Sequence, residues 1–171
     1  MLKQDQTLTN LRANSALAGK LVWIGIRPAH HVAMIMSKTA TLITNVGIEG
    51  DHSATQEGKK RQVSLIQAEH LDVIATLSND PSVLPDQLRR NLMIEGINVL
   101  SLKDQIFMIG NCILEGTGAC HPCSRMEEVL GKGGYNAMRG HGGITARILK
   151  GGIISTGNSV SIKQKKSSYG D

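Results

Sequence analysis

One short stretch of the chain, residues 116–126, gathers side chains that are capable of chemistry. This Gly-rich segment holds the thiols of Cys120 and Cys123, the imidazole of His121 and the guanidinium of Arg125, at the expected start of a short helix. A thiol at a helix N-terminus and near an arginine has its thiolate favoured by the helix dipole and by the neighbouring charge. Cys123 fits that position best, so the sequence predicts Cys123 as a nucleophile or soft metal ligand, tuned by His121.

The loop thiols also admit other interpretations. A Cys-x-x-Cys pair forms half of a zinc site, but a second Cys or His pair at suitable spacing is absent from the sequence. A thioredoxin-type site would need the pair to follow a strand in a βαβ unit, which the pattern does not predict. A buried free cysteine is the plainest alternative, and Cys112, inside an apolar segment, suits it better than Cys123. An odd count of 3 cysteines without an export signal indicates reduced thiols.

Basic side chains cluster at two predicted strand entrances, around Arg61 and around Arg89. Charges at strand entrances usually only face the solvent at the rim of a sheet, so neither cluster identifies a site by itself. Because a guanidinium matches phosphate oxygens in a bidentate way, both clusters are expected to line one phosphate pocket with further arginines. These are Arg125, Arg139 and Arg147. His52, in a turn-like segment, is expected to face the same site. The glycine tracts after position 130 lack the Gly-Lys-Ser/Thr ending of a nucleotide-binding loop, which argues against a P-loop.

Short apolar segments punctuated by glycine, asparagine and aspartate dominate the chain, and these predict strands. Two segments with helical spacing interrupt them, one over residues 67–78 and one beginning near Ser124. Many short strands, few helices and no regular strand–helix alternation favour a mainly β, barrel-like fold over a doubly wound sheet. The predicted strands are 21–26, 39–46, 62–66, 91–94, 105–109, 112–115 and 159–162, the last preceded by a turn at Gly157-Asn158.

Composition narrows the class of protein and of partner. The 171 residues suffice for one domain with a core that needs neither disulfides nor a structural metal, and with 2% aromatic residues that core must be aliphatic. A net charge of +5 without aromatic platforms for bases favours a small phosphorylated molecule over nucleic acid. No secretion signal or membrane span is recognisable, so a cytoplasmic protein that does not bind membranes is expected. The expected body is 20–163, between an N-terminal extension, 1–19, and a tail, 164–171, both prone to fraying.

Taken together, motifs spread over residues 20–163 resemble the MOSC domain, a family named for the C-terminal domain of molybdenum cofactor sulfurases. Each motif is weak alone, but their order and spacing make the set specific. This chain departs from the family pattern at Asn158, where an aspartate is usual, and at His52-Ser53, where Arg and His are usual. The motifs are Gly47 to His52, Gly58 to Ile66 with Glu69, Arg89 to Leu92 with Gly96, Phe107 to Gly110, Cys120 to Arg125, and Arg139 to Gly152.

The resemblance implies a closed β-barrel of the MOSC and pyruvate-kinase-barrel-like type, with a pocket for the molybdenum cofactor, a molybdenum–pyranopterin. It implies that Cys123 ligates molybdenum or carries sulfur. It also implies that Arg89 and Asn91 hold the pterin or its phosphate, and that Ser64 lies in the same wall. With Arg61, Arg125 and His52 from the arguments above, these residues make up the expected site.

Two functions of different classes follow from this site. In the first, the protein is a small reductase, in which molybdenum held by the Cys123 thiolate removes oxygen from N-hydroxylated compounds. In the second, it is a non-catalytic carrier of the cofactor, or of sulfur as a Cys123 persulfide. The chain contains neither a domain that binds pyridoxal phosphate nor a ferredoxin-type cysteine set. Either role would therefore require a protein partner in trans: an electron donor, or a pyridoxal-phosphate-dependent cysteine desulfurase.

Overall fold

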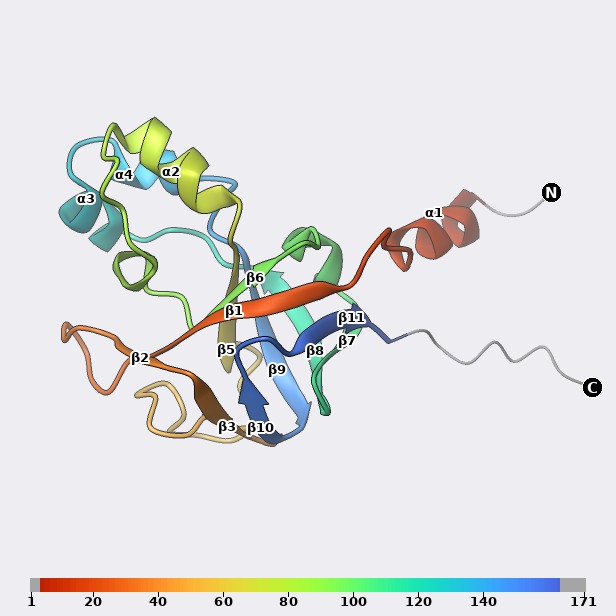
Figure 1. The fold of residues 1–171 in the computed structure, drawn as a ribbon. Helices are drawn as coiled ribbons and strands as arrows, with labels where there is room; N and C mark the ends of the chain where they lie inside the picture. Colours follow the sequence, from red (N-terminus) through yellow and green to blue (C-terminus); the bar gives the residue numbers. More distant parts are fainter. Residues whose placement is uncertain (1–3, 164–171) are drawn as a thin grey trace, which may run out of the picture.

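Seven strands close into a β-barrel in the computed structural model, which describes residues 4–163 (Figure 1). The strand order is β11–β7–β8–β9–β5–β6–β1, and β1 pairs back with β11 to close the ring. The predicted closed barrel is therefore confirmed. Its strands are β1 (Gly19–Ile26), β5 (Val63–Gln67), β6 (Leu92–Glu95), β7 (Ile106–Ile109), β8 (Cys112–Ala119), β9 (Ile144–Lys150) and β11 (Ser159–Ile162).

Neighbouring barrel strands are antiparallel, except that β5 and β6 run parallel, with Leu65 opposite Leu92. The first residues of both strands consequently lie at the same end of the barrel. β1 ends there too, because it is antiparallel to β6. Residues that immediately precede β5 and β6, or follow β1, are thereby brought together although they are far apart in the sequence.

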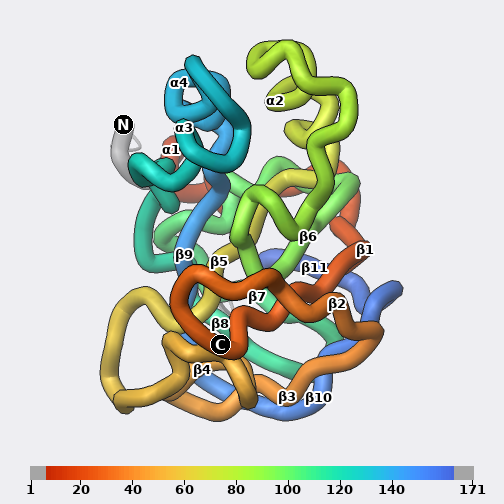
Figure 2. The backbone as a smooth tube through the Cα atoms, turned by 90° about the vertical axis from the view of Figure 1, so that its left-hand side faces the viewer, coloured from red at the N-terminus to blue at the C-terminus, as the bar shows by residue number. Residues whose placement is uncertain are grey.

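A smaller sheet flanks the barrel at this end. It has the order β10–β3–β4, with β10 (Gly152–Ser155), β3 (Thr39–Ile43) and β4 (Gly47–Ile48). β2 (Ile35–Ser37) pairs with β1 and forms an edge of the main sheet. Figure 2 looks onto this side of the molecule, with β3, β4 and β10 below and the helices α2 (His70–Ser78), α3 (Arg125–Leu130) and α4 (Gly134–Met138) above.

Two hydrophobic clusters stabilise the structure. The barrel interior is aliphatic apart from Phe107 and Cys112, as the composition requires, and includes fully buried Leu21, Leu65 and Ile94. A second cluster lies beneath the helices, where Met126 and Met138 pack with neighbouring aliphatic side chains. The α-helices are α1 (Gln4–Arg12), α2 (His70–Ser78), α3 (Arg125–Leu130) and α4 (Gly134–Met138), and the short 3₁₀ helices are η1 (Pro85–Leu88) and η2 (Val99–Leu102).

The structure corrects several sequence-based predictions. The segment 39–46 is not one strand, because a turn separates β3 from β4. Residues 4–12, predicted to fray, form α1, while the fraying predicted for the tail falls outside the described residues. The predicted Gly-rich loop begins later than expected, since residues 116–119 belong to β8. Strands β2, β9 and β10 and helix α4 were not predicted at all.

Gly116 shows why this glycine-rich segment forms a strand. A β-carbon there would lie 2.1 Å from the carbonyl oxygen of Leu102, so only glycine allows η2 to approach β8 so closely. The β8–β9 register shifts between Gly116 and Gly118, which marks a bulge. The glycines therefore serve close packing and local bending of the barrel wall, rather than a flexible loop.

Within residues 4–163, no helix is long and apolar enough to cross a membrane.

Candidate functional site

A polar network at the shared end of β1, β5 and β6 is centred on the carboxylate of Asp51. Arg27 donates to it from its backbone N, Nε and Nη2 at 3.0, 3.2 and 3.1 Å. Ser53 donates from its backbone N and Oγ at 3.0 and 2.7 Å, and Asn91 Nδ2 donates at 2.8 Å. The Asp51 side chain is 1% exposed, so the network fixes a buried charge at the base of the site.

The protonation of Asp51 reflects these contacts. Burial alone would raise the pKa of this carboxyl, because it disfavours the charged form. The hydrogen bonds from Arg27 and Ser53 outweigh burial and lower the pKa of Asp51 to about 2. Asp51 is therefore ionised at any physiological pH and holds the guanidinium of Arg27 in place. For His52, burial and the charge of Arg27 lower the pKa, which favours a neutral ring.

Asn91 and Ser64, both predicted to bind the cofactor, bond mainly to each other. Ser64 donates from its backbone N and Oγ to Asn91 Oδ1 at 3.1 and 2.9 Å, and Asn91 N donates back to Ser64 Oγ at 3.0 Å. The Asn91 amide also donates to the carbonyl of Gly25 at 3.1 Å. Both side chains are buried. They tie the starts of β5 and β6 to the end of β1, and so support the site from within.

Arg90 supports the cysteine loop from behind. Its guanidinium is buried and donates to the backbone carbonyls of Gly142, Leu88 and Cys120 at 2.8, 3.0 and 3.2 Å. Burial lowers the pKa of Arg90, while the negative charges that Cys120 and Cys123 would carry as thiolates oppose this. Arg90 therefore lies near both thiols. Cys123 is exposed, whereas Cys120 is buried.

Two further arginines lie near Cys123 and hold the loop between β1 and β2. Arg89 Nη1 donates to the carbonyl of Val32 at 2.9 Å, and Arg125 Nη1 contacts His31 Nδ1. A guanidinium cannot accept a hydrogen bond, so His31 Nδ1 is the acceptor. Burial lowers the pKa of Arg89, as do the charges of Arg125 and then Arg27, while Asp51 and Cys123 raise it. The arginines and the thiol thus form one electrostatic cluster.

The other predicted residues lie at varying distances from this cluster. His52 stacks on His30, with ring centroids 4.3 Å apart, at its edge. Arg61 is exposed on the segment before β5, and its charge reaches Arg90. Arg147 instead forms an ion pair with Glu115 on the β8–β9 wall. The structure thus brings Arg89, Arg125, Asn91, Ser64 and His52 together with Cys123, but places Arg147 in a different setting.

The cluster that results is strongly cationic around one accessible thiol. Arg27, Arg89, Arg90 and Arg125 contribute four positive charges, against the single buried carboxylate of Asp51. Helix α3 has only six residues, so its dipole adds less than the sequence argument assumed. Such a cluster suits an anionic ligand with an atom that bonds to sulfur. Among the described residues, no group of three His, Cys, Asp or Glu side chains is arranged to hold a metal ion.

Sequence reasoning missed two contributors to this site. Arg27 was not predicted, although it follows a predicted strand directly, and Asp51 was quoted only as part of a motif. The signal that could have found them is the pairing of a strand-end arginine with an aspartate in a Gly-Asp turn. Arg90 was grouped with Arg89 as a rim charge, but it is 7% exposed and each of its three guanidinium nitrogens donates to a backbone carbonyl.

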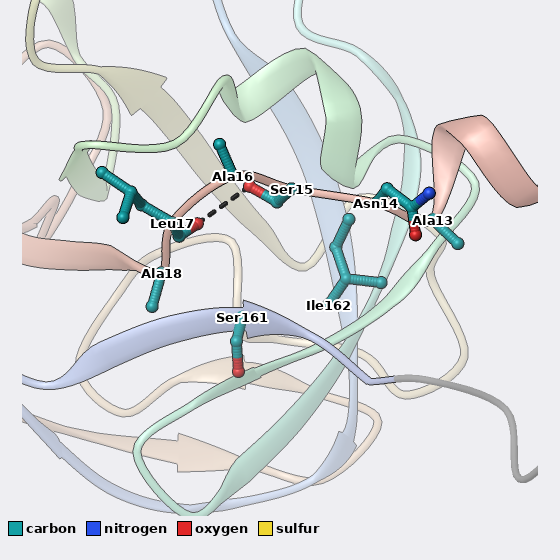
Figure 3. Close-up of a pocket in the computed structure, with 8 residues that line it drawn as sticks. All are labelled: Ala13, Asn14, Ser15, Ala16, Leu17, Ala18, Ser161 and Ile162. Carbon is teal, nitrogen blue, oxygen red and sulfur yellow. Dashed lines mark hydrogen bonds between the residues drawn. The ribbon is translucent and has the colours of Figure 1, made fainter.

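A hollow on another part of the surface carries no comparable chemistry. It has a volume of about 230 Å³ and lies between residues 13–18 and β11 (Figure 3). Its lining consists of alanine, serine, leucine, isoleucine and asparagine side chains, without an ionisable group. This hollow therefore offers no alternative to the site around Cys123.

Comparison with known proteins now identifies the family. The MOSC domain matches residues 51–161, more than half of the chain. This chain belongs to the MOSC domain family. The family resemblance predicted from the motifs is confirmed. The match includes the cysteine loop, β5, β6 and Asp51, but it begins after Arg27. No curated protein matches the chain.

Solved structures share the fold at low sequence identity. The YuaD protein of Bacillus subtilis has a TM-score of 0.74 and 20% identity, covering 88% of this chain and 98% of that one. YiiM of Escherichia coli has a TM-score of 0.66 and 18% identity, covering 87% and 72%. YiiM of Geobacillus stearothermophilus has a TM-score of 0.70 and 13% identity, covering 88% and 77%. These three proteins therefore share the fold of this chain although their sequences differ widely.

Proposed function

We propose that this MOSC protein binds the molybdenum cofactor at Cys123 and, with the cofactor bound, reduces N-hydroxylated compounds. The observation that carries the proposal is the exposed Cys123 thiol within a cluster of arginines. The cofactor combines a thiophilic metal with an anionic phosphate, and the site offers a soft thiolate and guanidinium groups. We further propose that the protein works in the cytoplasm with an electron-donor protein in trans.

The residues present fit such a ligand. Nε of Arg125 is buried and has no hydrogen-bond partner among residues 4–163, so it is available to an anion. Within the described residues, the Arg89 guanidinium bonds through Nη1, to the carbonyl of Val32, which leaves donors on the same guanidinium. Arg89 and Arg125 would hold the phosphate, and Cys123 would ligate the metal. When bound, the cofactor supplies the two-electron chemistry that removes oxygen from the substrate.

The protein's own residues would then position and shield the ligand. Asp51 holds Arg27, and Asn91 with Ser64 fixes the strand ends beneath it, so the cationic wall is preorganised before the ligand arrives. Preorganised charges lose little free energy to rearrangement on binding. Arg61 and His52 lie at the rim, where they would contact the solvent-facing part of the ligand.

Metal analysis of purified variants tests cofactor binding. Protein from a molybdenum-replete host should contain molybdenum, and Cys123→Ser should lose it, because serine keeps the shape and removes the soft ligand. Cys120→Ser is the matched control in the same loop and should retain a substantial part. If Cys120→Ser loses the metal and Cys123→Ser keeps it, the ligand is the other thiol. If neither variant nor the wild type holds molybdenum, the proposal fails.

The exposure of Cys123 also supports a second candidate, a carrier of cofactor or sulfur. A partner protein can reach an exposed thiol directly, and a pyridoxal-phosphate-dependent cysteine desulfurase would supply sulfur to form a Cys123 persulfide. Cyanide releases such sulfur as thiocyanate. Cyanide-labile sulfur on wild type but not on Cys123→Ser, with no reduction of an N-hydroxylated compound by reduced viologen, would favour the carrier. The converse result would favour the reductase.

A further inference from the structure

Cys120 has no part in the proposed cofactor chemistry, yet the structure holds it firmly beside Cys123. Its backbone N donates to the carbonyl of Gly143 at 2.9 Å, and its carbonyl accepts from Arg90 Nη2 at 3.2 Å. A β-carbon on Gly142 would lie 2.2 Å from that carbonyl oxygen, so the chain behind Cys120 is packed without spare room. Cys120 is thus a fixed, buried thiol.

Cys123 is held differently, three residues later. Its carbonyl accepts from Met126 N at 3.0 Å in the first turn of α3, while its side chain is exposed. Three residue steps span at most roughly 11 Å even when extended, and a disulfide requires Cα atoms within roughly 7 Å, so a modest bend of the loop suffices. Both thiols also lie close enough to Arg90 for their charges to act on it.

We propose that Cys120 is the resolving thiol of Cys123: once a hydroperoxide has oxidised the exposed thiol, the buried one closes a Cys120–Cys123 disulfide. The asymmetry of the pair supports this assignment, because an oxidant in solution meets Cys123 first and Cys120 is reached only from within the loop. Cys112 is not the partner. It begins β8 at the far end of that strand, roughly 25 Å of extended chain from Cys120.

The reaction balances as two displacement steps. In the first, the Cys123 thiolate attacks the hydroperoxide, an S–O bond forms, the O–O bond breaks, and with one proton from water the products are a sulfenic acid and an alcohol. In the second, the sulfur of Cys120 attacks the sulfur of Cys123, the S–S bond forms, the S–O bond breaks, and water leaves with the thiol proton. Two thiols are oxidised and one peroxide is reduced.

Closure of this disulfide would remove the free thiol on which the proposed function rests. Oxidation would then release or exclude the cofactor, and a thiol reductant would restore binding. This consequence depends on cofactor binding by Cys123. The disulfide itself does not, so the two can fail separately.

The test uses the reduced, full-length protein without molybdenum and hydrogen peroxide as the hydroperoxide. After a brief treatment, followed by unfolding and alkylation of the remaining thiols, the wild type should have lost two hydrogens and carry one alkyl group, on the buried Cys112, among its three cysteines. Peptide mapping should show the Cys120–Cys123 link. Cys120→Ser should instead gain one oxygen and be trapped by dimedone at Cys123, Cys123→Ser should resist oxidation, and Cys112→Ala should behave like the wild type.

Two results would overturn the inference. One is a wild type that gains oxygen and forms as much dimedone adduct as Cys120→Ser, since Cys120 would then resolve nothing. The other is a mapped disulfide that includes Cys112. Because the disulfide is mapped on the wild type, this second result does not depend on whether a variant folds. Molybdenum content before and after oxidation of loaded protein then tests the link to the proposed function: a protein that forms the disulfide but never holds molybdenum refutes the proposed function alone.

Discussion

Replacement of Asp51 by asparagine should destabilise the fold by a predictable, pH-dependent amount. The carboxylate accepts hydrogen bonds from Arg27, Ser53 and Asn91, and asparagine would offer one acceptor oxygen in place of two and no charge. Its NH₂ group would moreover face groups that are themselves donors. Asparagine has nearly the same shape, so the loss reports on charge and hydrogen bonding rather than on packing.

The magnitude follows from the depressed pKa of Asp51. A fall from 3.8 to about 2 corresponds to about 2.5 kcal/mol of stability at neutral pH. The Asp51 side chain is 1% exposed, so solvent screens this contribution little, and the 20% exposed Arg27 side chain keeps access to water once its partner is gone. We therefore expect Asp51→Asn to lower the free energy of unfolding by about 2–3 kcal/mol.

The pH dependence has a definite sign. Because the folded-state pKa is lowered, the contribution of Asp51 is complete above the unfolded value of 3.8 and disappears as the pH falls towards about 2. The difference between wild type and Asp51→Asn should consequently shrink to about half at pH 3. This difference is measured by urea unfolding, monitored through the fluorescence of Trp23, the single tryptophan of the chain.

A surface variant provides the control. Asp104→Asn removes an exposed ion pair with Lys103, whose side chains are 68% and 42% exposed, and should cost less than about 1 kcal/mol at any pH. A difference for Asp51→Asn that stays constant from pH 7 to pH 3, or that matches Asp104→Asn at pH 7, would refute the argument that the ionised carboxylate organises the site.

Three further predictions concern the cation cluster, the glycine-rich packing and the absence of a structural metal. Arg89→Ala should weaken binding of a pterin phosphate by about 2 kcal/mol, or roughly 30-fold in Kd, whereas Lys103→Ala should not; equal losses in a titration would mean that bulk charge alone matters. Gly143→Ala should cost more than about 2 kcal/mol, because φ is +80° and the new β-carbon would lie 1.8 Å from Leu65 O. Gly140→Ala is the control: φ is +79°, but no atom lies within 4 Å of the new β-carbon, so it should cost about 1 kcal/mol in the same urea assay. Similar losses for the two variants would show that backbone strain alone determines the cost. A chelator should leave Tm unchanged in thermal unfolding, and a large drop would point to a structural metal.

The elements that the sequence predicted are those with a strong local signal. Apolar runs bounded by turn residues predicted all the barrel strands except β9, and helical spacing predicted α2 and α3. The missing strand, β9, stands between Gly143 and Gly151, so its segment resembled a glycine-rich loop. Both glycines are needed because neighbouring backbone approaches closely: a β-carbon would lie 1.8 Å from Leu65 O at one and 2.2 Å from Leu42 O at the other. These contacts are with strands that are distant in the sequence, so local sequence patterns cannot predict them.

The candidate site was predictable where chemistry is concentrated in one segment, and unpredictable where it depends on contacts across the chain. Two thiols and an arginine in six consecutive residues, 120–125, are visible in the sequence itself. Arg27 is an ordinary strand-end arginine until the fold places it against Asp51, 24 residues later, and Asn91, 64 residues later. Arg90 could not be distinguished from Arg89 in the sequence, because the direction of each side chain depends on a backbone conformation that the sequence does not show.

Arg89 and Arg90 contact different segments of the chain, and this difference shows how the topology builds a site from a simple Arg-Arg-Asn sequence. Arg89 adopts a left-handed backbone conformation, with φ of +55°, at the end of η1 and three residues before β6 begins. Consecutive side chains there leave in different directions: Arg89 reaches the carbonyl of Val32 on the β1–β2 loop, and Arg90 turns inward to the carbonyl of Cys120. Asn91 then bonds to Ser64 on the parallel neighbour β5. A parallel pair places two strand starts side by side, so one tripeptide links the outer loop, the thiol loop and the barrel wall. An antiparallel pair would put the start of β5 at the opposite end, and Ser64 could not bond to Asn91 beneath the arginines.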